Sequence, residues 1–290
     1  MTKILFMGLG TMGYPMAGHL KKSGYEVTVY NRTVSRAKKW AKEFFGNYTN
    51  EPANEASFFD IVFACVGNDD DLKEVTCGEK GILKKMRNGA IFVDHTTASA
   101  SVERELFNIS KDLQIKYLDA PVSGGEKGAQ DGKLTIMCGG EETAFKEVEE
   151  VMASYSQTCK LMGKIGSGQL TKMANQICIA GILQGLSEAI NFSQRAGIDV
   201  DKMIGVISKG AAGSWQLENR GKTMAANKFD FGFAVDWMRK DLDICLREAD
   251  SNGSPLPLVS LVDQFYKEVQ LMGGGRWDTS SLIKRFENLN

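Results

Sequence analysis

Short runs of apolar residues alternate with amphipathic segments through the first half of the chain. Such short runs predict strands, and the continuously apolar runs at 60–66 and 90–94 predict parallel strands that are buried on both faces of a sheet. The predicted strands lie at residues 3–7, 26–30, 60–66, 90–94, 114–119 and 134–138. Helices are predicted at residues 16–20, 34–45, 70–75, 100–113 and 141–152. The alternation predicts a doubly wound α/β domain over residues 1–163.

The pattern changes in the second half of the chain. Residues 168–196 contain no proline and place apolar side chains at helical spacing. This predicts one long linking helix of roughly 40 Å. Helix signals then dominate to the end, so residues 164–290 are predicted to form an all-α domain. We expect a cleft between the two domains, because ligand sites favour such interfaces.

Composition and charge narrow the class of protein. The 290 residues include 35 basic and 36 acidic side chains, so a nucleic-acid partner is not expected. The longest apolar stretch, residues 177–183, is too short to span a membrane, and no secretory leader is expected. The six cysteines lack metal-binding spacing and there are two histidines, so no metal site is expected. Free thiols favour a cytoplasmic location.

The first candidate site is the segment Gly8-Leu9-Gly10-Thr11-Met12-Gly13, between a predicted strand and a predicted helix. In such a unit Gly8 permits a tight turn, Gly10 lets the backbone approach a pyrophosphate, and Gly13 lets helix and strand pack closely. The helix N-terminus offers N–H groups and partial positive charge to the phosphates. This predicts a Rossmann-type dinucleotide site; the alternative is an ordinary glycine-rich surface loop.

The end of the second predicted strand indicates which dinucleotide binds. A site for NAD usually places Asp or Glu there to accept hydrogen bonds from the ribose 2′-hydroxyl. This chain has Asn31-Arg32-Thr33 instead. Arg32 can pair with a 2′-phosphate and its neighbours can hydrogen-bond to it, which favours NADP(H) over NAD(H). Alternatively, Arg32 is a solvated charge that opens the next helix and Asn31 is the N-cap.

A second candidate site follows the fifth predicted strand. Ser123, Gly124 and Gly125 lie beyond its carboxyl end, where open α/β sheets bind ligands. A hydroxyl and converging backbone N–H groups suit an anion such as a small carboxylate substrate. The alternative is a glycine-rich turn without a ligand.

A third candidate site opens the long helix. Lys172 is followed by Asn175 and Gln176, which lie one helical turn further on. The lysine can hydrogen-bond a substrate oxygen while the two amides position the substrate. Most lysines are solvated surface charges, so that remains the alternative.

Four segments, taken in this order, resemble the β-hydroxyacid dehydrogenase family. They are residues 8–13, 119–125, 166–176 and 240–242. The family includes 3-hydroxyisobutyrate dehydrogenase, tartronate semialdehyde reductase, and glyoxylate and succinic semialdehyde reductases. The resemblance covers essentially the whole chain. It implies an oxidoreductase that transfers hydride between a nicotinamide cofactor and a small hydroxy acid or semialdehyde.

The resemblance also implies roles for single residues. Lys172 would be the general acid/base, and residues 123–125 would hold the substrate carboxylate. Thr97 and Lys240 would lie near the cofactor, with Val66 as a further cofactor-binding candidate. Many family members have Asn where this chain has Gln176. Tartronate semialdehyde reductases share the Asn-Gln pair but typically carry an acidic NAD signature, so substrate and cofactor analogies point to different relatives.

In the hypothesis that follows, NADPH delivers hydride to an aldehyde or ketone carbon while Lys172 donates a proton to the developing alkoxide. The helical domain would set specificity. Candidates for the substrate pocket are Ser214, Trp215, Phe231, Phe233, Asp236 and Trp237. Aromatic residues at such spacing more often belong to the core, which is the alternative.

Two other functions remain open. An imine reductase shares this architecture but tends to place Asp or Tyr where Lys172 stands. A non-catalytic dinucleotide-binding module would also explain the glycine segment. Gly181 and Gly185 could allow close helix packing, and relatives are typically oligomers, so a homodimer or homotetramer formed through the helical domain is expected.

Overall fold

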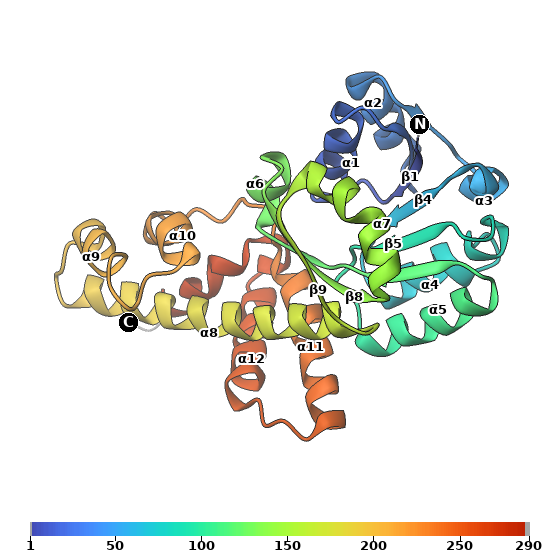
Figure 1. The fold of residues 1–290 in the computed structure, drawn as a ribbon. Coiled ribbons are helices and arrows are strands. Elements are labelled where there is room, and N and C mark those ends of the chain that lie inside the picture. Colours follow the sequence, from blue (N-terminus) through green and yellow to red (C-terminus); the bar gives the residue numbers. More distant parts are fainter. Residues whose placement is uncertain (1, 288–290) are drawn as a thin grey trace. The chain divides into compact units, whose positions relative to one another are not determined.

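The computed structural model describes residues 2–287, which divide into two compact units between Lys172 and Met173 (Figure 1). The division falls inside helix α8 (Ser167–Arg195), whereas the sequence placed the domain boundary at 163. The first turn of α8 belongs with the sheet because Asp119 accepts hydrogen bonds from two backbone N–H groups, one just before α8 and one in its first turn. Its carboxylate oxygens lie 2.7 Å from the nitrogen of Gly166 and 2.8 Å from that of Gln169.

The first unit is built on one sheet with the strand order β3-β2-β1-β4-β5-β6-β8-β7, in which β9 also pairs with β8. The pairs from β3 to β6 are parallel, β8 is antiparallel to β6 and β7, and β9 is parallel to β8. The strands are β1 Lys3–Met7, β2 Glu26–Tyr30, β3 Asn47–Tyr48, β4 Ile61–Ala64, β5 Ile91–Asp94, β6 Lys116–Asp119, β7 Val122–Ser123, β8 Leu134–Gly140 and β9 Ser156–Gly163.

The strand order reverses between β1 and β4, and the carboxyl ends of strands at such a switch point are where open α/β sheets bind ligands. The order confirms the predicted Rossmann-type doubly wound sheet.

Helices cover both faces of this sheet, so its central strands are buried. Along β1, Ile4 and Phe6 belong to one apolar core and Leu5 and Met7 to the other, because alternate side chains point to opposite faces. α1, α2 and α7 contribute to the first core, and α4 and α5 to the second. The helices are α1 Gly13–Lys22, α2 Val34–Phe44, α3 Pro52–Glu55, α4 Asp69–Cys77, α5 Ala100–Asp112, α6 Gly125–Gln130 and α7 Glu142–Met152, with 3-10 turns at Ala56–Phe58, Leu83–Lys85 and Ala153–Tyr155.

The second unit is helical apart from one isolated bridge between Ala234 and Asp278 in its described part. α11 and α12 pack together, and Leu183, Leu242 and Val262 lie in the unit's own core with no exposed surface. Beyond α8 the helices are α9 Val200–Ile207, α10 Trp215–Ala225, α11 Val235–Asn252 and α12 Pro257–Leu271, with 3-10 turns at Gly274–Arg276 and Thr279–Phe286. Within residues 2–287, no helix has both the length and the apolar character needed to cross a bilayer.

Candidate active site

The glycine segment forms the turn between β1 and α1. Gly8 has a φ of +94°, and a Cβ there would collide with the carbonyl oxygen of Cys65. A Cβ on Gly13 would collide with the carbonyl oxygen of Gly8 and lie 3.0 Å from the ring of Phe6. Gly10 borders open space instead. The first and third glycines are therefore required by the fold, and the second keeps the backbone accessible.

The segment after β2 is tied to this turn. Asn31 Oδ1 accepts a hydrogen bond from the Leu9 backbone N–H at 2.9 Å, and Asn31 Nδ2 donates to the Thr33 carbonyl oxygen at 3.1 Å. The alternative that Asn31 is a helix N-cap is wrong, because Thr33 occupies the N-cap position of α2. The side chain of Arg32 is 87% exposed and forms an ion pair with Asp71 of α4 at 3.1 Å. The structure thus leaves the guanidinium accessible to solvent.

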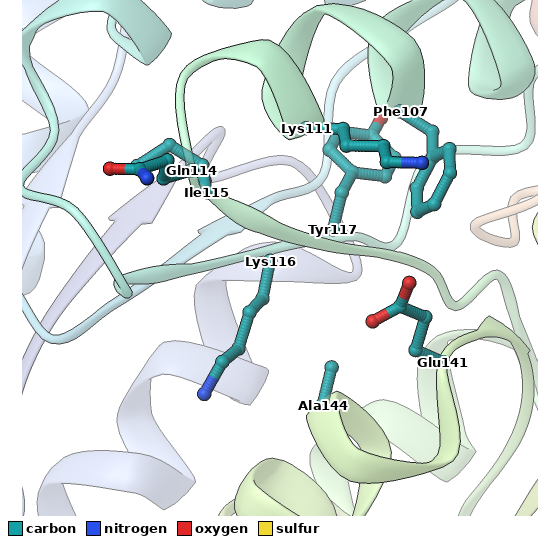
Figure 2. Close-up of a pocket in the computed structure, with 8 residues that line it drawn as sticks. All are labelled: Phe107, Lys111, Gln114, Ile115, Lys116, Tyr117, Glu141 and Ala144. Atoms are coloured by element: carbon teal, nitrogen blue, oxygen red, sulfur yellow. The ribbon is translucent and has the colours of Figure 1, made fainter.

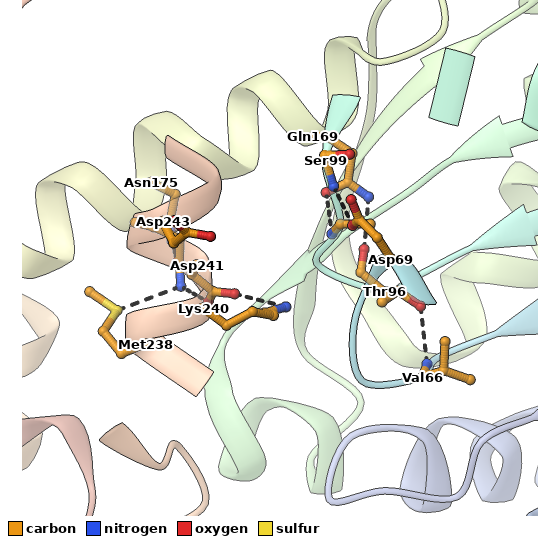
Figure 3. Close-up of polar contacts among 12 residues, drawn as sticks. Val66, Asp69, Thr96, Ser99, Gln169, Asn175, Met238, Lys240, Asp241 and Asp243 are labelled. Atoms are coloured by element: carbon orange, nitrogen blue, oxygen red, sulfur yellow. Dashed lines mark hydrogen bonds and ion pairs between the residues drawn. The ribbon is translucent and has the colours of Figure 1, made fainter. Parts of the chain in front are cut away.

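The loops that follow β4 and β5 are joined through Thr96. Its hydroxyl accepts a hydrogen bond from the Val66 backbone N–H at 3.0 Å and donates to Asp94 Oδ1 at 2.7 Å. Ser99, the N-cap of α5, donates its backbone N–H to Asp69 at 2.9 Å (Figure 3). Thr97 lies between these anchored positions and is partly exposed.

Three acidic side chains behind these loops have no exposed surface: Asp94, Glu103 and Asp119. Burial raises the pKa of Asp94 to about 7 and that of Asp119 to about 6. Burial, followed by the charges of Asp94 and Asp119, raises the pKa of Glu103 well above its usual value. Burial lowers the pKa of His95 to about 4. Asp94 accepts hydrogen bonds from Thr96, and Asp119 accepts them from Gly166 and Gln169, so these two carboxyls anchor the loop after β5 and the start of α8.

The predicted carboxylate-binding residues lie where β7 leads into α6. Ser123 ends β7 and is partly exposed, whereas Gly124 and Gly125 are exposed. Gly125 begins α6, a short helix that the sequence did not predict because its first residues are typical of a turn. A Cβ on Gly125 would meet open space.

Lys172 lies in α8 and is 7% exposed, so it is not the solvated surface lysine of the alternative interpretation. One turn further along the same helix, Asn175 Nδ2 donates to Gln176 Oε1 at 2.8 Å. Gln176 Nε2 in turn donates to Asp241 of α11 at 2.6 Å. Lys240 pairs with the same carboxylate at 3.0 Å (Figure 3).

Three hydrogen-bonding residues were not singled out from the sequence: Gln169 and Thr96 in the first unit, and Asp241 in the second. Gln169 and Asp241 lie inside two of the four recognised motifs, which was the available signal. Their partners are distant in sequence, so no local pattern could assign them.

The proposed pocket-wall residues differ in their surroundings within the second unit. Ser214 is the N-cap of α10, and Trp215 is 47% exposed. The Arg220 guanidinium lies over the ring of Phe231, 4.1 Å from its centroid. Phe233 packs against the core, and Asp236 Oδ1 accepts a hydrogen bond from Gln270 at 2.6 Å.

The first unit also carries a hollow. Figure 2 shows its lining, and none of the predicted site residues belongs to it. It is lined by Phe107, Lys111, Gln114, Ile115, Lys116, Tyr117, Glu141 and Ala144. Among the residues that the structure describes, no group of three or more His, Cys, Asp or Glu side chains is arranged to hold a metal ion.

Two family models match the chain. Residues 3–163 match the model for the NAD binding domain of 6-phosphogluconate dehydrogenase. Residues 166–286 match the model for the NAD-binding of NADP-dependent 3-hydroxyisobutyrate dehydrogenase.

Individual proteins match over nearly the full length. An uncharacterised oxidoreductase of Shewanella frigidimarina is 58% identical over 99% of both chains. A probable mitochondrial 3-hydroxyisobutyrate dehydrogenase-like protein of Arabidopsis thaliana is 39% identical over 100% of this chain and 86% of its own. A 2-hydroxy-3-oxopropionate reductase of Escherichia coli is 33% identical over 98% of this chain and 97% of its own. The structure of Mycobacterium tuberculosis 3-hydroxyisobutyrate dehydrogenase with L-serine is 25% identical, with a TM-score of 0.89 over 99% of each chain.

Proposed function

Because this chain belongs to the β-hydroxyacid dehydrogenase family, and is thus an NAD(P)-dependent hydroxyacid dehydrogenase, we propose that it interconverts a small semialdehyde acid and its hydroxy acid. NADP(H) is the favoured cofactor and Lys172 is the general acid/base.

The observation that carries the substrate class is the full-length similarity to two relatives with chemically related names. 3-Hydroxyisobutyrate and 2-hydroxy-3-oxopropionate are both propionate derivatives with oxygen on carbon 3 and a different substituent on carbon 2. In both compounds the alcohol or aldehyde is at carbon 3, and carbon 3 is bonded directly to carbon 2, which bears the carboxylate. We therefore favour 3-oxopropionates with a small 2-substituent over glyoxylate or succinic semialdehyde.

The glycine turn supports dinucleotide binding. Gly10 borders open space, while Gly8 and Gly13 keep the turn close to the sheet, so the backbone can approach a pyrophosphate. The segment Asn31-Arg32-Thr33 has no carboxylate, and the exposed Arg32 can pair with a 2′-phosphate. These residues support NADP(H) over NAD(H).

Lys172 would donate a proton to the substrate oxygen in the reductive direction and remove it in the oxidative direction. When bound, the nicotinamide supplies or accepts the hydride. In reduction the carbonyl carbon gains the hydride, the π electron pair moves onto oxygen, and the Lys172 ammonium gives up its proton and becomes a neutral amine. Before that transfer its positive charge stabilises the developing alkoxide.

The remaining residues would bind and orient the substrate. The Ser123 hydroxyl and the backbone N–H groups of Gly124 and Gly125 suit the carboxylate, because hydrogen bonds to an ionised acceptor are stronger than neutral ones. Asn175 is held by Gln176, which is itself held by Asp241, so its amide has a defined orientation beside the turn that carries Lys172. Lys240 would approach the cofactor.

The test is NADPH oxidation with methylmalonate semialdehyde, tartronate semialdehyde, succinic semialdehyde and glyoxylate, and NADH in parallel. We expect turnover of a 3-oxopropionate with NADPH preferred. Lys172→Ala should lower kcat by about 10²–10⁴-fold, the usual contribution of general acid–base catalysis. Lys160→Ala, which removes an exposed lysine of β9, is the matched control and should match wild type. NADPH binding without turnover of any aldehyde would contradict the proposal and favour an imine substrate or a non-catalytic role.

A further inference from the structure

The side chain of Gln169 hydrogen-bonds to the backbone of the residues on either side of Thr97. Its side chain is completely buried. Gln169 Oε1 accepts a hydrogen bond from the Ala98 backbone N–H at 3.2 Å, and Nε2 donates to the Thr96 carbonyl oxygen at 2.7 Å (Figure 3). Thr97 lies between these two backbone groups, so one carboxamide fixes the segment on either side of the residue that the family resemblance places near the cofactor.

The orientation of this carboxamide is itself determined. Nε2 also donates to Glu103 Oε1 at 2.7 Å, and Glu103 Oε2 accepts a hydrogen bond from the Tyr117 hydroxyl at 2.8 Å. A flipped amide would face the Ala98 N–H with its own N–H groups and would face two acceptors with its oxygen. Only the observed orientation satisfies all three contacts.

The main chain of Gln169 is anchored as well. Its backbone N–H donates to Asp119 at the end of β6, at 2.8 Å. Lys172 follows one helical turn later on α8, and side chains at this spacing lie on the same face of a helix. Thr96 continues the chain of contacts to the Val66 backbone N–H. Gln169 therefore joins the loops after β4 and β5 to the turn that carries Lys172.

We propose that Gln169 is a positioning residue for hydride transfer, a role that rests on the function proposed above. It holds the Thr97 segment at a fixed place relative to the helical turn of Lys172, without touching substrate or cofactor. A misplacement of about 1 Å can lower an enzymatic rate by about 100-fold. Cofactor affinity should change less than kcat, because this carboxamide hydrogen-bonds to Ala98, Thr96 and Glu103 and not to the glycine turn or the segment at 31–33, which are proposed to hold the pyrophosphate and the 2′-phosphate.

The first experiment compares Gln169→Leu with Gln184→Leu. Gln184 is another buried glutamine of α8, and its Nε2 donates to Glu188 one turn along the same helix. We expect Gln169→Leu to lower kcat by about 100-fold while the NADPH Kd changes far less. With NADPH deuterated at the transferred position, the primary isotope effect on kcat of Gln169→Leu should exceed that of wild type. The reason is that slower hydride transfer limits kcat to a greater extent. Gln184→Leu should resemble wild type in all three measurements.

The second experiment uses Gln169→Glu, which keeps the shape of the side chain. The new carboxyl would face Glu103, Asp94, Asp119 and Tyr117, and burial beside acids raises a carboxyl pKa. When protonated it can donate one hydrogen bond to the Thr96 carbonyl, and when ionised it can donate none and repels that oxygen. Relative to wild type, kcat of this variant should therefore be higher near pH 6 than near pH 8. For Gln169→Leu, kcat should be reduced by the same factor at both pH values.

A Gln169→Leu variant with wild-type kcat and isotope effect would overturn the positioning role. So would a loss of activity that equals the loss of folded protein and leaves the isotope effect unchanged. If Gln169→Leu does not fold, the test is kcat of Gln169→Glu divided by kcat of wild type, measured near pH 6 and near pH 8. A value independent of pH would overturn the role. A wild-type enzyme that binds NADPH but reduces no semialdehyde would instead overturn the proposed function, and the role of Gln169 with it.

Discussion

Arg32 is held by a solvated ion pair that a bound cofactor could replace. Its partner Asp71 is 30% exposed, and an ion pair this accessible contributes less than about 1 kcal/mol. A 2′-phosphate would attract the guanidinium more strongly than one carboxylate does, because it carries more charge and more acceptor oxygens. Asp71 would also repel that phosphate. These two residues should therefore act on NADPH affinity in opposite directions.

Arg32→Ala should raise the NADPH Kd by about 10- to 100-fold, corresponding to about 1.5–3 kcal/mol for hydrogen bonds between charged groups. Asp71→Asn should lower the NADPH Kd, and neither change should alter the NADH Kd appreciably. Fluorescence titration with both cofactors measures this. Arg87→Ala, which removes an arginine paired with Asp60 elsewhere on the unit, is the control. If Arg32→Ala raised the Kd values of NADPH and NADH by the same factor, Arg32 would not be binding the 2′-phosphate.

At the scale of elements, the turn from β1 to α1 contains glycines for two different reasons: close packing of helix and strand, and access for a ligand. Gly13 lies where any Cβ would collide with backbone, so it determines how closely helix and strand pack. Gly10 has room for a Cβ within the fold, so a requirement for glycine there would come from a ligand. Substitution to alanine should therefore affect folding at one position and binding at the other.

Gly13→Ala should destabilise the protein by about 1–3 kcal/mol, because the chain must shift to admit the methyl group. Gly10→Ala should leave the free energy of unfolding within about 1 kcal/mol of wild type but weaken NADPH binding. Urea unfolding and cofactor titration of both variants test this pair. Tight NADPH binding by Gly10→Ala would argue against close approach of a pyrophosphate at this turn.

The elements also show how far the sequence could be interpreted. β1 and β2 have the bounds predicted for them, because each is a short segment rich in strand-forming residues and followed by turn residues. β9 was not predicted, since Ser156–Gly163 is mostly exposed and gains its strand structure from pairing with β8. The glycine turn was recognisable because its spacing along the chain sets a local conformation. The side-chain partners of Gln169 lie 66 to 73 residues away, and no local pattern specifies them.

At the scale of the whole molecule, buried acids couple folding to pH. The pKa of Asp94 rises from an ordinary 3.8 to about 7 through burial. The folded chain therefore binds more protons than the unfolded chain between these values, and this group's contribution to stability is lost as pH rises through about 7. Asp119 and Glu103 act in the same direction. Burial lowers the pKa of His95 from 6.5 to about 4. Between these two pH values the unfolded chain binds more protons, so the contribution of His95 to stability rises with pH.

Asp94→Asn isolates one of these contributions, because asparagine retains an oxygen to accept the hydrogen bonds from Thr96. The variant should be less stable than wild type near pH 5, and the difference should shrink by on the order of 1–2 kcal/mol by about pH 7.5. The reason is that wild type loses the benefit of the bound proton while the amide has none to lose. Urea unfolding at the two pH values measures the change, with the exposed Asp112→Asn as the control. A difference that stays constant or widens with rising pH would mean that Asp94 is ionised throughout, and that the loops after β4 and β5 are anchored to a buried charge.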